Sequence, residues 1–310
     1  MPRPDFPRTL RDFFERFPKE DDCWQWLVEQ RWPDGYQCAD EHPGWLIKDR
    51  KLFECCNGHQ WSVTSGTIMH GTHQPLKDWF LAAYLMVTMV PGISARQLAR
   101  QLGRAPGDIF TAYAMLHKLR AAMVPSLYDD TKLAGTVQAD EVFISGGRKR
   151  EGHKGKHQCV VAALEVKDDR AGRIRLKKIS GPTTRNLSRF MVDNVARNAI
   201  VTTDGAPGYK ELHRYGYDHR VDMGGEEKYK ENYPLPELHR VFSNLKTWIL
   251  GTHHGAIMHK HLQAYLNEFA FRFNFRHSKF AAFQILLGIG THVEAPTYKE
   301  IFSGEWKHSA

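Results

Sequence analysis

The spacing of hydrophobic and polar positions changes twice along the chain and divides it into three regions. Residues 1–70 hold short apolar pieces between turn-forming residues, a pattern typical of small β-hairpins. From residue 75 to residue 123 the apolar positions recur at helical spacing. Beyond residue 135, runs rich in Val, Ile and Leu alternate with helical segments. The pattern therefore predicts domains at 1–70, 71–130 and 131–310.

The helical region contains three predicted helices. The first covers the most apolar stretch of the chain, residues 79–90, which is too short to span a bilayer. The second opens at Ser94, where Gln97 completes a capping box, and closes at Gly103. The third runs from about residue 107 to 122. Two short helices after a longer one are typical of a helix-turn-helix; a plain helical spacer with solvated arginines is the alternative. The arginines available for DNA are Arg96, Arg100 and Arg104.

Beyond residue 135 the order of elements is that of an RNase H-like domain. The predicted strands are 136–144, 158–166 and 173–179, followed by a helix at 186–198, a buried strand at 200–203 and a helix at 238–250 stopped by Gly251. The apolar run 262–275 is expected to be core. The predicted fold class is α+β or α/β: an RNase H-like mixed sheet with flanking helices, preceded by a small β-ribbon and the helix-turn-helix.

Two aspartates stand out in this sheet. Asp140 lies inside the first strand between apolar neighbours, where a charge is expensive unless a cation compensates it. Asp204 directly follows the buried strand and precedes Gly205. Two convergent carboxylates could hold a pair of Mg²⁺ or Mn²⁺ ions and support phosphodiester chemistry. Taken singly, each aspartate also fits an ordinary turn or cap.

Charge and cysteine content give weak indications of the partner and of the cellular compartment. The net charge of +8 favours a polyanionic partner, although many basic proteins do not bind nucleic acid. Five cysteines do not suggest a disulfide scaffold, and Cys23 and Cys159 are interpreted as packing residues. Asp5 and Arg8 occupy the place where a secretory signal would be apolar, so we expect a cytoplasmic protein with no membrane partner.

The chain resembles, over most of its length, bacterial and archaeal insertion-sequence transposases that carry an N-terminal zinc ribbon and a DDE-type catalytic domain. The matching segments are 61–68, 75–82, 92–98, 139–147, 203–205, 242–246, 251–254 and 265–274. The resemblance implies DNA transposition, with Asp140 and Asp204 as the first two metal ligands and DNA element ends and target DNA as partners. It also implies a homodimer or higher oligomer, because two element ends are processed together, and association with the nucleoid.

The third ligand position departs from the family pattern. In most members a glutamate lies seven residues before a helical lysine; with Lys246 as that lysine, the position holds His239. A subgroup is similar in carrying Asn-Leu-Lys, here Asn244 to Lys246. The ring nitrogen of His239 could bind Mn²⁺ better than Mg²⁺. His239 is therefore the first candidate, Asn244 the second and Glu237 the third, while Lys246 is assigned a phosphate or transition-state contact.

The ribbon departs from its pattern as well. A zinc ribbon needs four ligands, usually from two Cys-x2-Cys knuckles. Here Cys38-x3-His42 could combine with His59 and either Cys55 or Cys56 to hold Zn²⁺. Alternatively, the ribbon has lost its metal and is held by aromatic packing of Trp45, Phe53 and Trp61.

A basic loop follows the first catalytic strand and is expected to contact DNA phosphates, or else to be a solvated hairpin loop. Its cations are Arg148, Lys149, Arg150, Lys154 and Lys156. The sequence thus predicts a transposase with metal-dependent DNA cleavage and strand transfer. The alternatives are a DNA-binding relative without chemistry, which His239 in the glutamate position keeps open, and an RNase H-like nuclease that does not transpose.

Overall fold

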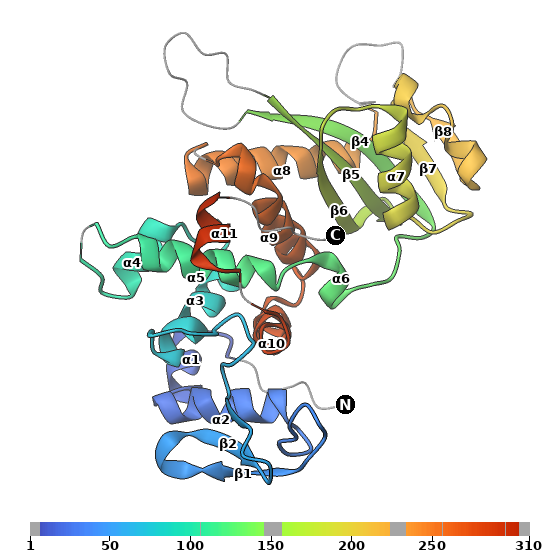
Figure 1. The fold of residues 1–310 in the computed structure, drawn as a ribbon. Coiled ribbons are helices and arrows are strands. Elements are labelled where there is room, and N and C mark those ends of the chain that lie inside the picture. The colour runs from blue at the N-terminus through green and yellow to red at the C-terminus, as the bar shows by residue number, and fades with distance from the viewer. Residues whose placement is uncertain are drawn as a thin grey trace. The chain divides into compact units, whose positions relative to one another are not determined.

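The computed structural model describes residues 7–105, 107–145, 157–223, 234–255, 257–294 and 296–303, apart from the side chains of Ser145 and Phe280. The chain divides into two compact units, residues 1–123 with 278–307 and residues 124–277 with 308–310 (Figure 1). Each unit is described by itself. The three-domain division made from the sequence stays a prediction. No helix within the described ranges is both long and apolar enough to cross a membrane.

The first unit is built around α3 (Leu76–Thr88), nine of whose residues are buried. α2 (Glu20–Arg31), α5 (Phe110–Ala121) and α10 (Lys279–Gly290) pack against it. The apolar stretch near residue 80 is therefore the centre of a helical core, as the helical periodicity predicts. The aromatic rings at this centre belong to Phe13, Phe17, Phe80, Tyr84 and Phe283. The remaining helices of the unit are α1 (Leu10–Arg16), α4 (Ala95–Gln101) and α11 (Tyr298–Ser303).

α4 begins as predicted. The Ser94 hydroxyl accepts from the Gln97 backbone N–H, and the Gln97 side chain accepts from the backbone N–H of Ser94, which completes the capping box. α4 then packs against α5. The helices at 76–88, 95–101 and 110–121 confirm the helical interpretation of this region.

Residues 1–70 contain the predicted hairpin strands, but also two helices that the sequence pattern did not indicate. Residues 10–16 and 20–31 are helical, and the strands are confined to β1 (Gly44–Ile47), β2 (Leu52–Cys55) and β3 (Gln60–Ser62), an antiparallel sheet in the order β1-β2-β3. The 3-10 helix η1 (Lys48–Arg50) joins the first two strands. α2 lacks a single apolar stripe because its tryptophans pack in two directions: Trp24 stacks on Phe53 of the ribbon, and Trp26 meets the ring of Phe80.

The second unit contains the five-stranded sheet. Its strands are β4 (Thr136–Ser145), β5 (His157–Lys167), β6 (Arg170–Ile179), β7 (Ile200–Thr203) and β8 (Asp218–Val221), in the order β6-β5-β4-β7-β8. The first three strands are antiparallel neighbours, whereas β7 and β8 join in parallel. All four strands predicted from the sequence are present, and β7 has the predicted bounds.

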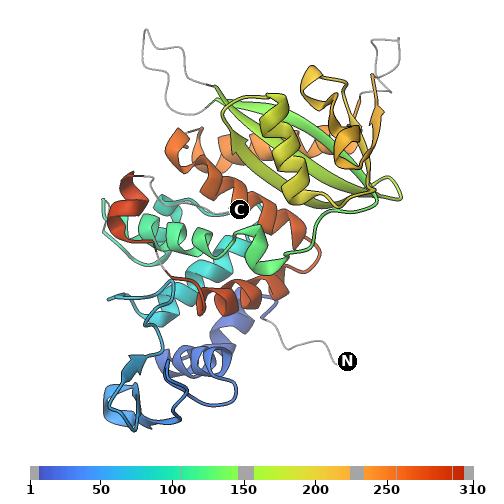
Figure 2. The same ribbon diagram turned by 45° about the vertical axis from the view of Figure 1, so that its right-hand side comes forward.

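Helices cover both faces of this sheet (Figures 1 and 2). α7 (Thr184–Asn194) packs on one face, where it shares a core with Val137, Ala139 and Val161. α8 (Pro236–His253) and α9 (Leu262–Asn274) pack on the other, with Val142 and Ile144. Because side chains alternate along a strand, even-numbered residues of β4 face α8 and odd-numbered residues face α7. The short elements of the unit are α6 (Pro125–Tyr128) and the 3-10 helices η2 (Pro207–Tyr209), η3 (Leu212–Tyr215) and η4 (His259–His261).

The predicted end of α8 at Gly251 was wrong, because the helix continues to His253. The last turn is held by packing: Thr252 is buried, and the ring of His253 lies 4.9 Å from that of Trp248 and 4.7 Å from that of Tyr265. His254 then takes the left-handed conformation that ends the helix. Tertiary contacts thus outweigh the low helix propensity of one glycine.

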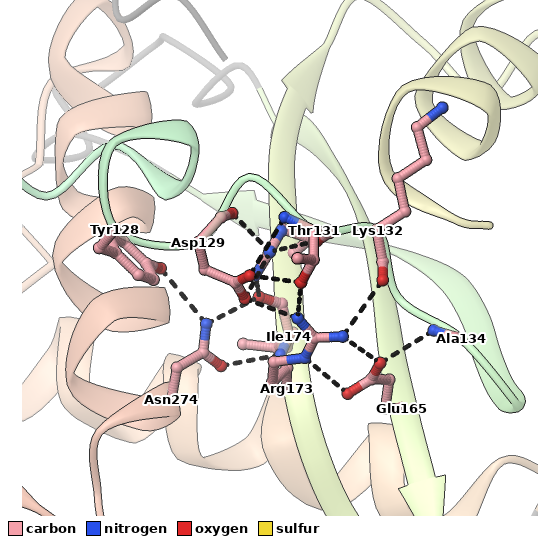
Figure 3. Close-up of polar contacts among 10 residues, drawn as sticks. Tyr128, Asp129, Thr131, Lys132, Ala134, Glu165, Arg173, Ile174 and Asn274 are labelled. Carbon is pink, nitrogen blue, oxygen red and sulfur yellow. Dashed lines mark hydrogen bonds and ion pairs between the residues drawn. The ribbon is translucent and has the colours of Figure 1, made fainter.

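An ion-pair network joins the segment before β4 to β6 (Figure 3). The Asp129 carboxylate accepts from Arg173 at 2.7 Å and from Arg175 at 2.9 Å, and it also accepts from the Thr131 hydroxyl at 2.6 Å. The same Arg173 guanidinium donates twice to Glu165, at 2.6 and 2.8 Å. Arg175 is only 4% exposed, so Asp129 compensates a cation that is almost fully buried.

Candidate functional site

Asp140 and Asp204 lie on neighbouring parallel strands. β4 pairs with β7 as far as Gln138 and Thr202, and each aspartate lies two residues further along its strand. The register therefore places the two aspartates level with each other on adjacent strands, just beyond the end of the β4–β7 pairing. Gly205, the residue after Asp204, has a φ of 83°, and a Cβ there would lie 2.8 Å from a side-chain carbon of β8. Only glycine fits this turn without displacement.

The environment of Asp140 disfavours its negative charge. Asp140 is 7% exposed and lies on the face of β4 that α8 covers. Burial raises the pKa of Asp140 to about 6, with a further contribution from Asp204 and against the hydrogen bond from the Glu141 N–H. A cation at this position would relieve both the desolvation and the repulsion.

His239, in the first turns of α8, meets the same carboxylate. Its Nε2 lies 3.5 Å from Oδ2 of Asp140. Burial and the charge of Lys246 lower the pKa of His239, although Asp204 opposes the shift. Burial and Lys246 thus favour the neutral ring, whose nitrogen lone pair a metal ligand needs.

The three side chains are grouped around Asp140, but loosely. Among the described residues, the sets of three Cys, His, Asp or Glu side chains whose ligand atoms all lie within 4.8 Å of one another are in the N-terminal ribbon. Asp140 and His239 lie 3.5 Å apart, so the ligand atom of Asp204 lies more than 4.8 Å from at least one of them. The chemistry of the donors, two carboxylates and one neutral imidazole, fits a divalent cation such as Mn²⁺ or Mg²⁺.

Two further candidates on α8, Asn244 and Lys246, are exposed and lie on different sides of the helix. Lys246 lies seven residues after His239, which is about two turns and roughly 10 Å along the same side of the helix. Asn244 lies five residues after His239, about 140° around the helix axis. The helix therefore presents Lys246, but not Asn244, on the side of the His239 ring.

Glu237, the third-ranked ligand candidate, has a buried partner. Its Oε2 accepts from Nε2 of Gln138 at 2.9 Å, and the Gln138 Oε1 accepts from the backbone N–H of Leu238 at 3.0 Å. Glu237 and Gln138 are each 9% exposed. The structure thus engages the Glu237 carboxylate in joining α8 to β4.

Glu141 and Tyr209 form a pair that the sequence analysis did not identify. The Tyr209 hydroxyl donates to Oε2 of Glu141 at 3.0 Å on the face of the sheet opposite His239. Burial, followed by the nearby Glu141 carboxylate, raises the pKa of Tyr209 well above its usual value, so the phenol keeps its proton. Because Tyr209 belongs to the loop that begins at Asp204, the bond ties that loop to β4. The adjacency of Glu141 to Asp140 was the only available signal.

A second cluster of metal-binding side chains lies in the N-terminal ribbon, where two knuckles share one backbone pattern. In the first, the Cys38 N–H donates to the His42 carbonyl, and in the second the Cys55 N–H donates to the His59 carbonyl. The residue three positions after each cysteine, Glu41 or Gly58, has a positive φ. The two Cys-x3-His segments are therefore structural equivalents.

The ligand atoms of these knuckles converge. The Sγ of Cys38 lies within 4.8 Å of the ligand atoms of His42 and Cys55, and also of those of Asp40 and His59. Cys55 is buried whereas Cys56 is exposed, which favours Cys55 as the partner of Cys38. Ligands of a tetrahedral Zn²⁺ are about 3.3–3.8 Å apart, so a small contraction would bring the cluster around an ion. This Cys/His group could bind zinc.

The candidate DNA-binding cations differ in their availability. Arg96 and Arg100 are exposed on α4. Arg104 is partly buried; it donates a hydrogen bond to Gln74 and forms an ion pair with Asp78 at 3.6 Å. The five cations of the basic loop lie outside the described residues.

The fold of the second unit, with Asp140 and Asp204 on adjacent strands, defines its class. A mixed sheet in the order β6-β5-β4-β7-β8, covered by helices on both faces, is an RNase H-like α+β fold. Residues 132–274 match the model of the ISXO2-like transposase domain. The match includes Asp140, Asp204 and the whole of α8. No curated protein matches the chain.

Proposed function

We propose that the protein is a DNA transposase that cuts DNA at the ends of a mobile element and joins the cut ends to a target. The transposase domain supports action on DNA. The observation that carries the chemistry is Asp140: a buried carboxylate with a raised pKa, next to the aspartate of the neighbouring strand and 3.5 Å from a neutral imidazole. Such a group gains most from a divalent cation.

Each ligand has a distinct proposed role. Two bound divalent ions would activate the attacking oxygen and stabilise the leaving one. Asp140, Asp204 and His239 would hold the ions, with Asp140 as the ligand next to His239. The neutral His239 would donate through its ring nitrogen and favour Mn²⁺ over Mg²⁺. Lys246, on the same side of α8, would hold a DNA phosphate as a compact charge.

Recognition of the element ends is proposed for the N-terminal unit. α4 and α5 would act as a helix-turn-helix, with Arg96 and Arg100 contacting DNA. The basic loop 147–156, which follows β4 in the sequence, would add phosphate contacts. Two protein copies would process the two element ends. The reaction would take place at the nucleoid.

The ribbon is proposed to hold one structural Zn²⁺ through Cys38, His42, Cys55 and His59. The repeated knuckle backbone and the converging ligand atoms support this set. A closed site with four protein ligands stabilises a fold and performs no chemistry.

The deciding experiment is DNA cleavage with Mg²⁺ or Mn²⁺ on a duplex that contains the flanking element end. The expected result is end-specific nicking by the wild type, abolished in Asp140→Ala and in Asp204→Ala. His239→Ala then tests the third ligand. Intact end binding without cleavage in either metal would refute the enzyme and support a DNA-binding relative, while metal-dependent cutting without end specificity would indicate a non-transposing nuclease.

A further inference from the structure

The side-chain amide of Gln138 is buried between β4 and the start of α8. Its oxygen accepts from the backbone N–H of Leu238 at 3.0 Å, and its nitrogen donates to the Glu237 carboxylate at 2.9 Å. These partners lie about one hundred residues further along the chain. Gln138 therefore joins a strand to a helix through two hydrogen bonds, in an interface that is formed mainly by apolar side chains.

The Gln138 oxygen supplies a hydrogen-bond acceptor that the first turn of α8 lacks. The first backbone N–H groups of a helix have no acceptor within the helix, and Leu238 is the third residue of α8. Leu235, the residue before the helix, has a φ of 53° and contributes no side-chain cap. The Gln138 oxygen thus caps the helix from a neighbouring strand. A buried N–H left without such an acceptor would cost about 1–3 kcal/mol.

Gln138 also stands directly beside the candidate ligands. It lies two residues before Asp140 on the same face of β4, and its partner Leu238 immediately precedes His239. Its two hydrogen bonds therefore restrain the rotation of α8 about its axis and its shift along that axis, both relative to β4. Either movement would change the 3.5 Å separation of the Asp140 and His239 side chains.

We propose that Gln138 is a positioning residue for the metal site, which holds the His239 helix in register with the Asp140 strand. This inference rests on the proposed function, because it requires Asp140 and His239 to share a metal centre. Metal ligands tolerate displacements of only a few tenths of an ångström, and loss of the groups that orient them typically costs about 10–100-fold in affinity.

The chemistry of the amide provides a reciprocal test. In Gln138→Glu the acceptor for Leu238 remains, but the donor is lost and a second carboxylate faces Glu237. The double variant Gln138→Glu/Glu237→Gln restores every bond with the amide and the carboxylate exchanged. Gln138→Met removes both bonds at similar volume. Gln30→Glu, on the exposed side of α2, makes the same charge change elsewhere and serves as the control.

The measurements are Mn²⁺ titration of the full-length protein, followed by electron paramagnetic resonance of free Mn²⁺, and cleavage of the element-end duplex, with thermal melting to verify folding. We expect Gln138→Glu and Gln138→Met to weaken Mn²⁺ binding about 10–100-fold. We expect the double variant to recover to within about threefold of the wild type, since a purely structural role would not couple recovery of Mn²⁺ affinity to this exchange.

The outcomes distinguish the positioning role of Gln138 from the proposed metal site. Wild-type Mn²⁺ affinity in a folded Gln138→Glu or Gln138→Met protein overturns the positioning role and leaves the transposase proposal intact. A folded double variant that binds Mn²⁺ as weakly as the single variant also overturns it. If the wild type itself neither binds Mn²⁺ nor cleaves DNA, the metal site fails, and this inference fails with it.

Discussion

Replacing Asp129 by asparagine should destabilise the RNase H-like unit through one buried guanidinium. The asparagine would keep the size of the side chain and an oxygen for the two Thr131 donors, but it would remove the charge that faces Arg175. Arg173 would retain its paired bonds to Glu165, whereas Arg175 would keep only backbone carbonyls as partners among the hydrogen bonds described. The loss therefore concentrates on Arg175.

The magnitude follows from the burial of this cation. Breaking a fully buried ion pair by neutralising one partner costs about 3–5 kcal/mol. Arg175 is 4% exposed, while the Asp129 side chain is 19% exposed and partly screened, so we expect about 3 kcal/mol. Backbone amides of β5 and β6 that exchange through opening of the unit should then exchange about 150-fold faster.

The contribution of Asp129 to stability should also depend on pH. Burial would raise the pKa of Asp129, but hydrogen bonds from Thr131, Arg175 and Arg173 outweigh it and hold the pKa well below 3.8. Because the folded pKa is lowered, the stabilisation is present above the unfolded value of 3.8 and is lost as the pH falls through the folded value. The difference between wild type and variant should therefore be constant near neutrality and shrink in acid.

The assay is hydrogen exchange with mass spectrometry at several pH values, corrected for intrinsic rates. Asp130→Asn, which neutralises the exposed neighbouring residue, is the matched control and should change stability by less than about 0.5 kcal/mol. An Asp129→Asn protein whose β5 and β6 amides exchange at the wild-type rate would refute the assignment of Asp129 as the compensating charge. Equal effects of the two substitutions would refute it as well.

Three further predictions concern the proposed functions. Cys55→Ser should abolish zinc in the purified protein, measured by atomic absorption, while Cys56→Ser should keep about one ion per chain; equal zinc contents would contradict the ligand set. Tyr209→Phe removes the donor to a half-buried carboxylate on β4, so it should lower the free energy of unfolding by about 1–2 kcal/mol and slow end cleavage about tenfold; an unchanged cleavage rate would show that the loop after the second aspartate is held by other means. Arg100→Ala should reduce the salt slope of end binding by about one unit, whereas Arg104→Ala, whose guanidinium is already ion-paired, should not; equal slopes would argue against α4 as the DNA-contacting helix.

The sequence predicted four strands of the five-stranded sheet because the composition of each segment is enough to identify a buried strand. Runs of Val, Ile and Leu identify buried strands, and β7 at 200–203 has the predicted bounds for this reason. The placement of Asp140 inside a strand and of Asp204 directly after one required only sequence position. The parallel register of β4 and β7 then brings both aspartates side by side, which strand order alone could suggest.

Other features depend on contacts between distant segments, which no local pattern encodes. α2 was missed because Trp24 and Trp26 pack toward different neighbours, so no single apolar stripe marks the helix. The last turn of α8 was missed because the packing of His253 against Trp248 outweighs the break expected at Gly251. The Gln138 link joins residues about one hundred positions apart, and a lone glutamine in a strand gives no sign of its partner.

The histidine at position 239 changes the charge of the site more than its geometry. A glutamate there, as in most of the resembling transposases, would bring a third carboxylate close to Asp140, whose pKa burial and Asp204 already raise to about 6. A neutral imidazole avoids that repulsion in the absence of metal, at the expense of attraction for a hard cation such as Mg²⁺. The Gln138 link acts on the backbone of α8 and on Glu237, so it can hold the helix equally well for either side chain. In the proposed metal site the exchange would therefore alter which metal is preferred, while the strand register and the helix anchor would remain the same.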